Sequence, residues 1–326
     1  MKMLRHLPDR FLYAAIGDVH GDLPALVAAV DAARARAAET RRKAVVVVLG
    51  DAIDRGPDSA GCAAFLMRLS RGGDPARTDT RLVFVRGDHD EALAYDAALD
   101  RFSSSVEPCE WAERLESLPP DNPERAVARD YIEFVREAPD SLLLRGEREG
   151  VLFAHGAVPH VDLLPRLNSL ADLDAPECRR DFSWCRLSSA RRKIPNRASL
   201  FCDVGLDDLA DALDWIEILV ATPGDMVGPP APDVFRIAHF IHGHEHTEPG
   251  WHREAVRGGR TAWTVTTFRD EGLFEPIRPA VLLLAEENTH AESAESSGRA
   301  RSPGAPDSGP VDNPIRPIPL FLKVPA

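Results

Sequence analysis

The sequence predicts an α/β fold that contains a parallel sheet, and two observations support this prediction. Three short apolar runs rich in β-branched or aromatic residues, at 11–16, 44–49 and 82–85, are typical of buried strands. Helical patterns over 24–38 and 59–69 separate these runs, and the first of them has proline in its opening turn. Because a strand–helix–strand order normally gives parallel neighbours, we expect the three strands side by side in one sheet.

The rest of the chain is expected to complete one large domain over residues 1–287. Further strands are predicted at 151–154, 235–241, 262–267 and 280–285, and a helix at 206–219. Residues 288–314 are mostly Ala, Ser, Gly, Pro and charged side chains, a composition typical of a disordered linker. The final segment, 315–326, is apolar with alternating prolines, so it should be extended. It would dock either on its own domain or on a partner, and the sequence leaves both open.

A short motif containing glycine and aspartate follows each of the first three predicted strands. These motifs are Gly17-Asp18-Val19-His20-Gly21, Gly50-Asp51-Ala52-Ile53-Asp54-Arg55-Gly56 and Arg86-Gly87-Asp88-His89-Asp90. Because the carboxyl ends of parallel strands form the ligand crevice of such a sheet, one cleft should contain Asp18, His20, Asp51, Asp88 and His89. Carboxylate and imidazole ligands suit manganese, iron or zinc. Two such cations polarise phosphoryl oxygens and activate water, so the pattern indicates a two-metal phosphoesterase.

Two more blocks follow later in the chain, Val151-Leu152-Phe153-Ala154-His155-Gly156 and Gly243-His244-Glu245-His246. In this order, the five blocks resemble those of the calcineurin-like metallophosphoesterase superfamily, and within it the phosphoprotein-phosphatase type of serine/threonine phosphatase. The matching segments run from about residue 13 to about residue 286. The resemblance implies an α/β/β/α sandwich of two mixed sheets, with a di-metal cleft at the C-terminal ends of strands.

The resemblance also implies a set of metal ligands, carried over position by position. Metal one would be held by Asp18, His20 and Asp51, while Asp51 would bridge to metal two, whose other ligands would be Asp88, His155 and His244. His246 matches only the Gly-His-x-His branch of the superfamily, where it also binds metal one, so this chain combines features of two branches. The expected cofactors are two divalent transition-metal ions, with manganese preferred over iron or zinc.

Four residues of the blocks match the family's catalytic positions. Arg55 and Arg86 correspond to arginines near the phosphate, and a planar guanidinium can bind two phosphate oxygens at once. His89 with Asp54 corresponds to the family's acid pair. The imidazole would protonate the leaving alkoxide, and the carboxylate would orient the ring and hold its proton.

Three further assignments are less fully specified by the sequence. The family's additional phosphate arginine corresponds to either Arg186 or Arg197. His242 stands where many protein phosphatases have an arginine, so the sequence supports a phosphate contact and a structural role equally. His239 is expected to be a satisfied core or edge histidine.

One position departs from the family pattern, because Asp88 stands where the family has asparagine. A carboxylate is a good oxygen ligand, so metal binding should survive the change. The charge of the site changes, which affects the rate, the preferred metal, or the competence of the chain as a catalyst.

The predicted function is hydrolysis of a phosphoester, foremost a phosphomonoester on serine or threonine of a phosphoprotein. The alternative is a small phosphorylated substrate such as a nucleotide or a dinucleoside polyphosphate. A second alternative is a catalytically weak phosphate-binding regulatory protein, made inert by Asp88.

Composition narrows the class of partner and the cellular compartment. The net charge of −13 argues against nucleic acid or anionic membranes as partners, because their affinity depends on basic surface. The odd count of five cysteines, together with an N-terminus that enters a strand too early for a signal sequence, predicts reduced thiols. No apolar run approaches the ~20 residues of a membrane helix. A soluble, cytoplasmic protein is therefore expected.

Overall fold

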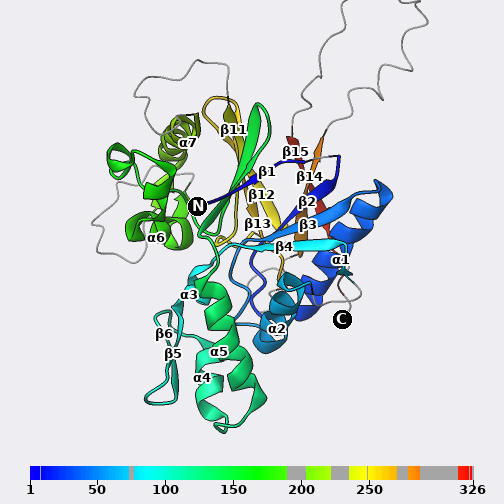
Figure 1. Cartoon of the computed structure of the whole chain (residues 1–326), viewed down its shortest axis with the longest axis vertical. Coiled ribbons are helices and arrows are strands. Elements are labelled where there is room, and N and C mark those ends of the chain that lie inside the picture. The colour runs from blue at the N-terminus through cyan, green and yellow to red at the C-terminus, as the bar shows by residue number, and fades with distance from the viewer. Residues whose placement is uncertain are drawn as a thin grey trace, which may run out of the picture.

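The computed structural model describes most of the chain and places it in two packed sheets with helices outside them (Figure 1). The described residues are 1–7, 9–72, 77–188, 203–221, 235–247, 249–269, 278–286, 315–322 and 324. The predicted linker at 288–314 and the candidate Arg197 lie outside these residues.

The first sheet has five strands in the order β15-β14-β2-β3-β4. Its strands are β2 (Phe11–Ile16), β3 (Lys43–Val48), β4 (Thr80–Phe84), β14 (Ala280–Glu286) and β15 (Ile315–Phe321). β2, β3 and β4 are parallel neighbours, as predicted, with Ala14 opposite Val46 and Val46 opposite Leu82. β14 runs antiparallel to β2, so the sheet is mixed.

The second sheet has six strands in the order β1-β7-β8-β11-β13-β12. Its strands are β1 (Lys2–Arg5), β7 (Ser141–Arg145), β8 (Glu149–Ala154), β11 (Arg236–His242), β12 (Trp251–Val256) and β13 (Arg260–Val265). β8, β11 and β13 are parallel to one another, and β1 is parallel to β7. β7 is antiparallel to β8, and β12 is antiparallel to β13. The strands predicted at 151–154, 235–241 and 262–267 are confirmed within two residues, while β1, β7 and β12 were not predicted.

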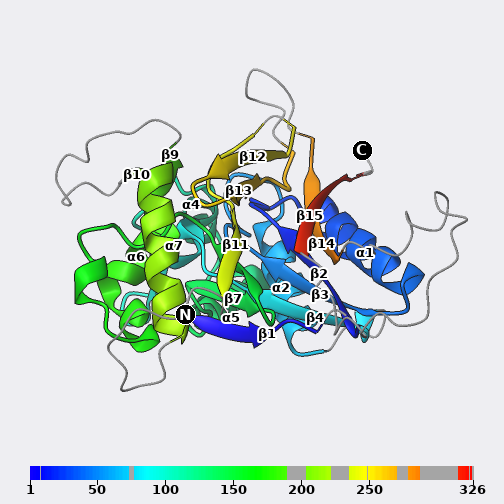
Figure 2. The same ribbon diagram turned by 90° about the horizontal axis from the view of Figure 1, so that it is seen from above.

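Successive side chains of each strand point to opposite faces of its sheet, and the apolar ones form three layers. Between the sheets, Tyr13, Val45 and Val83 pack with Leu142, Phe153 and Ile241. The opposite face of β2 and β3 packs on α1 (Leu23–Glu39) and α2 (Ser59–Ser70), and the outer face of the second sheet packs on α6 (Pro176–Trp184) and α7 (Leu206–Ala221). Figure 2 shows α1 and α7 on opposite flanks of the two sheets. The α/β/β/α sandwich expected from the resemblance is therefore confirmed.

A lobe that the sequence did not predict lies between β4 and β7. It contains α3 (Asp88–Ala92), the hairpin β5 (Leu93–Asp96) and β6 (Arg101–Ser104), α4 (Glu110–Ser117) and α5 (Pro123–Arg136). Figure 1 shows α4, α5 and the hairpin projecting at the lower end of the molecule. Trp111, Leu115 and Tyr131 attach the lobe to the core cluster that also contains α2.

The region after β8 is irregular before it reaches α7. It contains the short 3₁₀ helices η2 (Leu164–Arg166) and η3 (Leu170–Asp174), then α6, and a small parallel pair of β9 (Arg186–Ser188) with β10 (Asp203–Gly205). This pair matters for the site because β9 begins at Arg186, one of the two candidate phosphate arginines.

The C-terminal segment forms β15 on the edge of the first sheet. It pairs antiparallel with β14, placing Pro317 opposite Leu284 and Pro319 opposite Leu282. The ring of His239 joins this edge to the second sheet, because its Nδ1 and Nε2 lie 2.6 Å from Thr261 Oγ1 and from the carbonyl oxygen of Ile315. In the structure, 315–321 therefore docks on its own domain, and His239 has the satisfied core role expected from its sequence context.

The cysteine prediction needs a correction. Cys62, Cys109 and Cys178 are buried and form no disulfide, but Cys185 is disulfide-bonded, so the expectation that all cysteines are reduced is wrong for Cys185. An odd count requires only one unpaired cysteine and therefore does not exclude a bridge.

In the described part of the chain, no helix is both long and apolar enough to cross a membrane.

Candidate metal centre

Three loops at the carboxyl ends of β2, β3 and β4 bring three aspartates together, as predicted. Asp18, Asp51 and Asp88 are almost fully buried, with 1%, 1% and 4% of their surface exposed. The loops approach so closely that a Cβ on Gly50 would lie 2.4 Å from the backbone nitrogen of Gly87, and Gly50 has a φ of +89°. A glycine before Asp51 is therefore required by both space and backbone conformation.

The second sheet delivers three histidines to the same place. His155 follows β8, while His244 and His246 follow β11. The backbone nitrogen of His244 donates to Asp18 Oδ1 over 2.9 Å, so the loop after β11 is fixed directly to the loop after β2. His244 has a φ of +66°, which turns the chain sharply at this point.

These side chains form two clusters with ligand atoms close enough to hold a cation. One contains Asp51, Asp88, His155 and His244, and the other contains Asp18, His20 and His246; within each cluster all ligand atoms lie within 4.8 Å of one another. Asp51 lies between the clusters, because its Oδ2 is also 3.6 Å from His20 Nε2. The structure thus brings together all seven predicted ligands, in the two groups that the resemblance implies.

The chemistry of these residues fits metal ions. Asp18 Oδ2 and His20 Nε2 are buried and have no hydrogen-bond partner, a costly arrangement unless a cation lies between them. The other nitrogen of His20 lies 3.2 Å from the carbonyl oxygen of Ile53, and His155 Nδ1 lies 2.6 Å from that of Leu49. A backbone carbonyl behind Nδ1 fixes the tautomer that leaves Nε2 free for a metal.

Electrostatics of the protein without metal supports the same interpretation. Burial and the neighbouring Asp88 carboxylate raise the pKa of Asp51 well above its ordinary value. Burial also opposes ionisation of Asp88, but contacts with His155 and His244 outweigh it and hold the pKa of Asp88 below its usual range. Burial lowers the pKa of His155, yet the charges of Asp51 and Asp88 raise it well above normal. In the protein without metal, protons on histidine thus balance the negative charge of the carboxylates. Divalent cations would supply this positive charge in the metal-bound protein.

The predicted acid pair is in contact at the edge of these clusters. His89 Nδ1 lies 2.7 Å from Asp54 Oδ2, and Asp54 Oδ1 accepts a hydrogen bond of 3.3 Å from the backbone nitrogen of Trp111 in α4. Burial lowers the pKa of His89, but the charge of Asp51 and the hydrogen bond that His89 donates to Asp54 outweigh it and raise the pKa to about 9. In the protein without metal, these contacts therefore favour the protonated ring.

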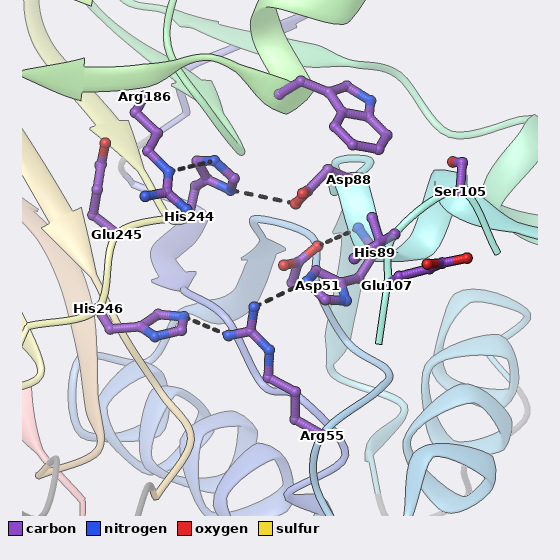
Figure 3. Close-up of a pocket in the computed structure, with 12 residues that line it drawn as sticks. Asp51, Arg55, Asp88, His89, Ser105, Glu107, Arg186, His244, Glu245 and His246 are labelled. Atoms are coloured by element: carbon purple, nitrogen blue, oxygen red, sulfur yellow. Dashed lines mark hydrogen bonds and ion pairs between the residues drawn. The ribbon is translucent and has the colours of Figure 1, made fainter. Parts of the chain in front are cut away.

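A cavity of about 600 Å³ opens over the clusters and the acid pair (Figure 3). Its wall is formed by Asp51, Arg55, Asp88, His89, Ser105, Val106, Glu107, Trp184, Arg186, His244, Glu245 and His246. In Figure 3, Arg186 and Glu245 lie on one side, and Ser105 and Glu107 lie on the opposite side beyond His89.

The three predicted arginines differ in position. Arg55 reaches across the cavity, with its terminal nitrogens 3.2 Å from His246 Nε2 and 3.0 Å from His89 Nε2. Arg186 Nε lies 3.4 Å from His244 Nε2, so the structure brings this candidate to the cavity wall.

Arg86 does not contribute to that wall. Its guanidinium donates to the carbonyl oxygens of Ala138 and Arg136 over 2.7 Å and 3.3 Å, and lies 3.4 Å from Asp140. These contacts brace the end of α5, which favours a structural role over the phosphate contact implied by the resemblance.

His242 also lies behind the cavity wall. Its ring stacks on Phe240 at 5.2 Å, its Nε2 lies 3.1 Å from Thr264 Oγ1, and its Nδ1 lies 3.1 Å from Glu245 Oε2. Of the two readings left open by the sequence, the geometry therefore favours the structural one.

Sequence reasoning missed Phe268, which lies just after β13. Its ring packs edge-on against His20 at 4.9 Å and against His246 at 4.8 Å, and its backbone nitrogen donates to the carbonyl oxygen of Asp18 over 2.9 Å. It therefore contacts all three members of one cluster. A lone aromatic residue after an apolar strand carries no local signal of such a role.

Asp90 and Tyr131 were also missed. Asp90 accepts hydrogen bonds from the backbone nitrogens of Ala52 and Gly87, and from the Tyr131 hydroxyl over 2.7 Å. These bonds tie together the loops that carry Asp51 and Asp88. Tyr131 comes from α5, so no spacing within the motifs could have revealed it.

This combination of a two-sheet sandwich and paired cation clusters defines a metal-dependent phosphoesterase. The chain belongs to the calcineurin-like phosphoesterase family, whose profile matches residues 11–248. None of the curated proteins compared with the chain matches it in sequence. The family assignment establishes a phosphoric ester hydrolase that uses divalent metal ions.

Several solved structures are similar to the chain at low sequence identity. A protein serine/threonine phosphatase from Saccharomyces cerevisiae is 14% identical, with a TM-score of 0.53 over 87% of this chain and 76% of that chain. A cold-active protein-tyrosine phosphatase from a psychrophilic Shewanella species is 13% identical, with a TM-score of 0.43 over 87% and 77%. A putative diadenosine tetraphosphatase is 14% identical, with a TM-score of 0.39 over 87% and 92%. At 14% identity, the similarity to the yeast phosphatase concerns the fold and leaves the substrate undetermined.

Proposed function

We propose that this chain is a phosphomonoesterase that uses water activated between two manganese ions, and that its substrates are serine or threonine phosphoesters of proteins. The observation that carries the proposal is the convergence of both cation clusters and the His89–Asp54 pair on one cavity. Iron and zinc are the alternative metals, because the same ligands accept them.

The protein's own residues divide the work at this site. Asp18, His20, Asp51 and His246 would hold one ion, and Asp51, Asp88, His155 and His244 the other. Bound ions supply Lewis acidity and a water that is deprotonated near neutral pH. Arg55 and Arg186 are placed to bind phosphate oxygens and so orient the ester bond.

His89 completes the reaction at the leaving group. Its raised pKa favours the protonated ring, which would donate the Nε2 proton to the departing alkoxide in place of the present contact with Arg55, while Asp54 at Nδ1 holds the ring in place. A serine or threonine alkoxide is strongly basic and needs such a proton. A general acid of this strength therefore fits an alkyl phosphoester better than an ester with a stable leaving anion.

The charge of the cavity wall favours the same choice. Glu107 and Glu245 stand on opposite sides of the cavity, so a leaving group that carries several negative charges meets carboxylates there. A nucleotide or dinucleoside polyphosphate remains the second candidate, because Arg55 and Arg186 could bind two phosphoryl groups at once.

A substrate panel tests the proposal directly. The manganese-loaded protein is assayed with phosphoserine and phosphothreonine peptides, p-nitrophenyl phosphate, bis-p-nitrophenyl phosphate and diadenosine polyphosphates. We expect phosphopeptides and p-nitrophenyl phosphate to be hydrolysed and diadenosine polyphosphates to be poor substrates. Preferred turnover of diadenosine polyphosphates would favour the second candidate, and turnover of none would favour a phosphate-binding regulatory protein.

A further inference from the structure

The two cation clusters have the same ligand chemistry. Each contains one carboxylate of its own and two imidazoles, and Asp51 stands between them as a shared carboxylate. The individual carboxylates are Asp18 in the first cluster and Asp88 in the second. Both are nearly fully buried, with 1% and 4% of their surface exposed.

The contacts of these two carboxylates also correspond. Asp18 Oδ2 lies 3.9 Å from His20 Nε2 and 3.4 Å from His246 Nε2. Asp88 Oδ1 lies 2.9 Å from His155 Nε2 and 3.3 Å from His244 Nδ1. In both clusters, therefore, one carboxylate lies within 4 Å of a nitrogen of each of two histidines, and the three ligand atoms are close enough to hold a cation.

This match depends on two residues, Asp88 and His246. Without His246, the first cluster would contain only one imidazole. With an amide in place of Asp88, the second cluster would lose its own negative charge, and the three-carboxylate centre would become a two-carboxylate centre. The charge of the ligands would then differ between the two positions.

We propose that Asp88 and His246 make the two metal positions chemically equivalent, so that both take up the same metal ion and depend equally on their own carboxylate. The proposal rests on the metal centre of the proposed function. With two divalent ions, three carboxylates leave one net positive charge for nucleophile and phosphate, whereas an amide at position 88 would leave two. The chain thus gains an evenly matched pair of ions and gives up some attraction for phosphate.

Equivalence makes a mirrored prediction for two substitutions. Asp18→Asn and Asp88→Asn each remove one unit of charge beside one cation, and each should weaken manganese binding at its own position on the order of 100- to 1,000-fold. The two losses should agree within about tenfold by that same reasoning. Asp140→Asn is the matched control, because Asp140 is equally buried but contacts Arg86 and Arg179 instead of the clusters.

The experiment is calorimetric titration of metal-free protein with manganese, with the number of retained ions counted after dialysis. The wild type and Asp140→Asn should bind both ions with unchanged affinity, and each of the mirrored variants should bind one of its two ions more weakly. If Asp88→Asn keeps two ions at unchanged affinity while Asp18→Asn loses one, the equivalence is refuted. Circular dichroism of each metal-free variant checks that the comparison is made between folded proteins.

A measurement on the wild type alone keeps the test independent of any variant's folding. Crystals grown with equimolar manganese and zinc are examined by anomalous diffraction at both absorption edges. Equivalent positions should show the same manganese-to-zinc ratio within about twofold, which corresponds to a small difference in affinity. Segregation of the metals to different positions would overturn the proposal. Equal ratios in a protein that hydrolyses none of the panel substrates would instead refute the proposed function and leave this inference standing.

Discussion

The two sheets contribute different chemistry to the cleft between them. The loops after β2, β3 and β4 supply all three carboxylates of the clusters together with one imidazole, His20, and they also supply the acid pair. The loops after β8 and β11 supply imidazoles, His155, His244 and His246. Without cations, these carboxylates and imidazoles balance one another across the seam, as the opposed pKa shifts of Asp88 and His155 show. Metal ions held by ligands from both sheets would therefore help to join the sheets.

The largest expected effect comes from removing the ions or their shared ligand. Chelation should abolish phosphatase activity, since both Lewis acid and nucleophile depend on the metals. It should also lower the melting temperature, because ligands at 100 times their dissociation constant stabilise a fold by about 2.7 kcal/mol. Calorimetry with and without manganese measures this shift.

Asp51→Asn provides the control for the chelation experiment. Because Asp51 lies between the clusters, this variant should lose activity, and added manganese should change its melting temperature little. A fully metallated and unimpaired Asp51→Asn protein would contradict the assignment of Asp51 as the bridge.

The next largest effect tests the acid pair on the carboxylate-rich side. His89→Ala should slow hydrolysis of alkyl phosphates by about 10²–10⁴-fold and affect p-nitrophenyl phosphate far less, since only the alkoxide needs a proton. Asp54→Asn should show the same asymmetry more mildly. Equal losses on both substrates would mean that His89 serves binding or structure.

The same pair makes a prediction about pH. A raised pKa means that the acid form of His89 is present below about 9 and is lost above it, so turnover of alkyl phosphates should fall as the pH rises through this region. Bound cations beside Asp51 shift this limb to lower pH. The limb should be missing from the profile of His89→Ala.

A smaller effect tests the imidazole-rich side. His246→Ala should weaken metal binding at the first cluster by about 10–100-fold, the range typical of disturbed metal sites. His242→Ala is the comparison, because His242 lies behind the wall against Phe240 and Thr264. Retention of both ions and a normal rate in His246→Ala would make His246 a bystander.

The smallest effect concerns the support behind one cluster. Phe268→Leu should loosen both His20 and His246 and reduce manganese affinity by up to about tenfold, the lower end of the range for residues behind ligands. Phe240→Leu removes a comparable ring that stacks on His242 instead, so it should leave metal affinity unchanged. The same titration measures both variants, and similar losses in the two would indicate general destabilisation.

How far the sequence could predict this site depends on where each residue lies in the chain. Asp18, Asp51 and Asp88 each stand within four residues after a short apolar strand. The shared edge of a parallel sheet was therefore enough to bring them together. Ser105 and Glu107 reach the cavity only because the lobe packs against α2, and no local pattern encodes that packing. Arg86 shows the opposite situation. Its motif predicted a phosphate contact, but its guanidinium instead donates to the backbone carbonyl of Ala138, just after α5.

The prolines of β15 have a consequence for how this protein meets other copies of itself. A residue without an N–H can sit in an edge strand only where its nitrogen faces away from the neighbouring strand, so Pro317 and Pro319 turn theirs away from β14 and outward. The outer rim of the sheet consequently lacks two successive donors that an incoming strand would need. β15 therefore makes a poor pairing partner for a strand of another molecule, which protects a concentrated solution of the enzyme against edge-to-edge aggregation.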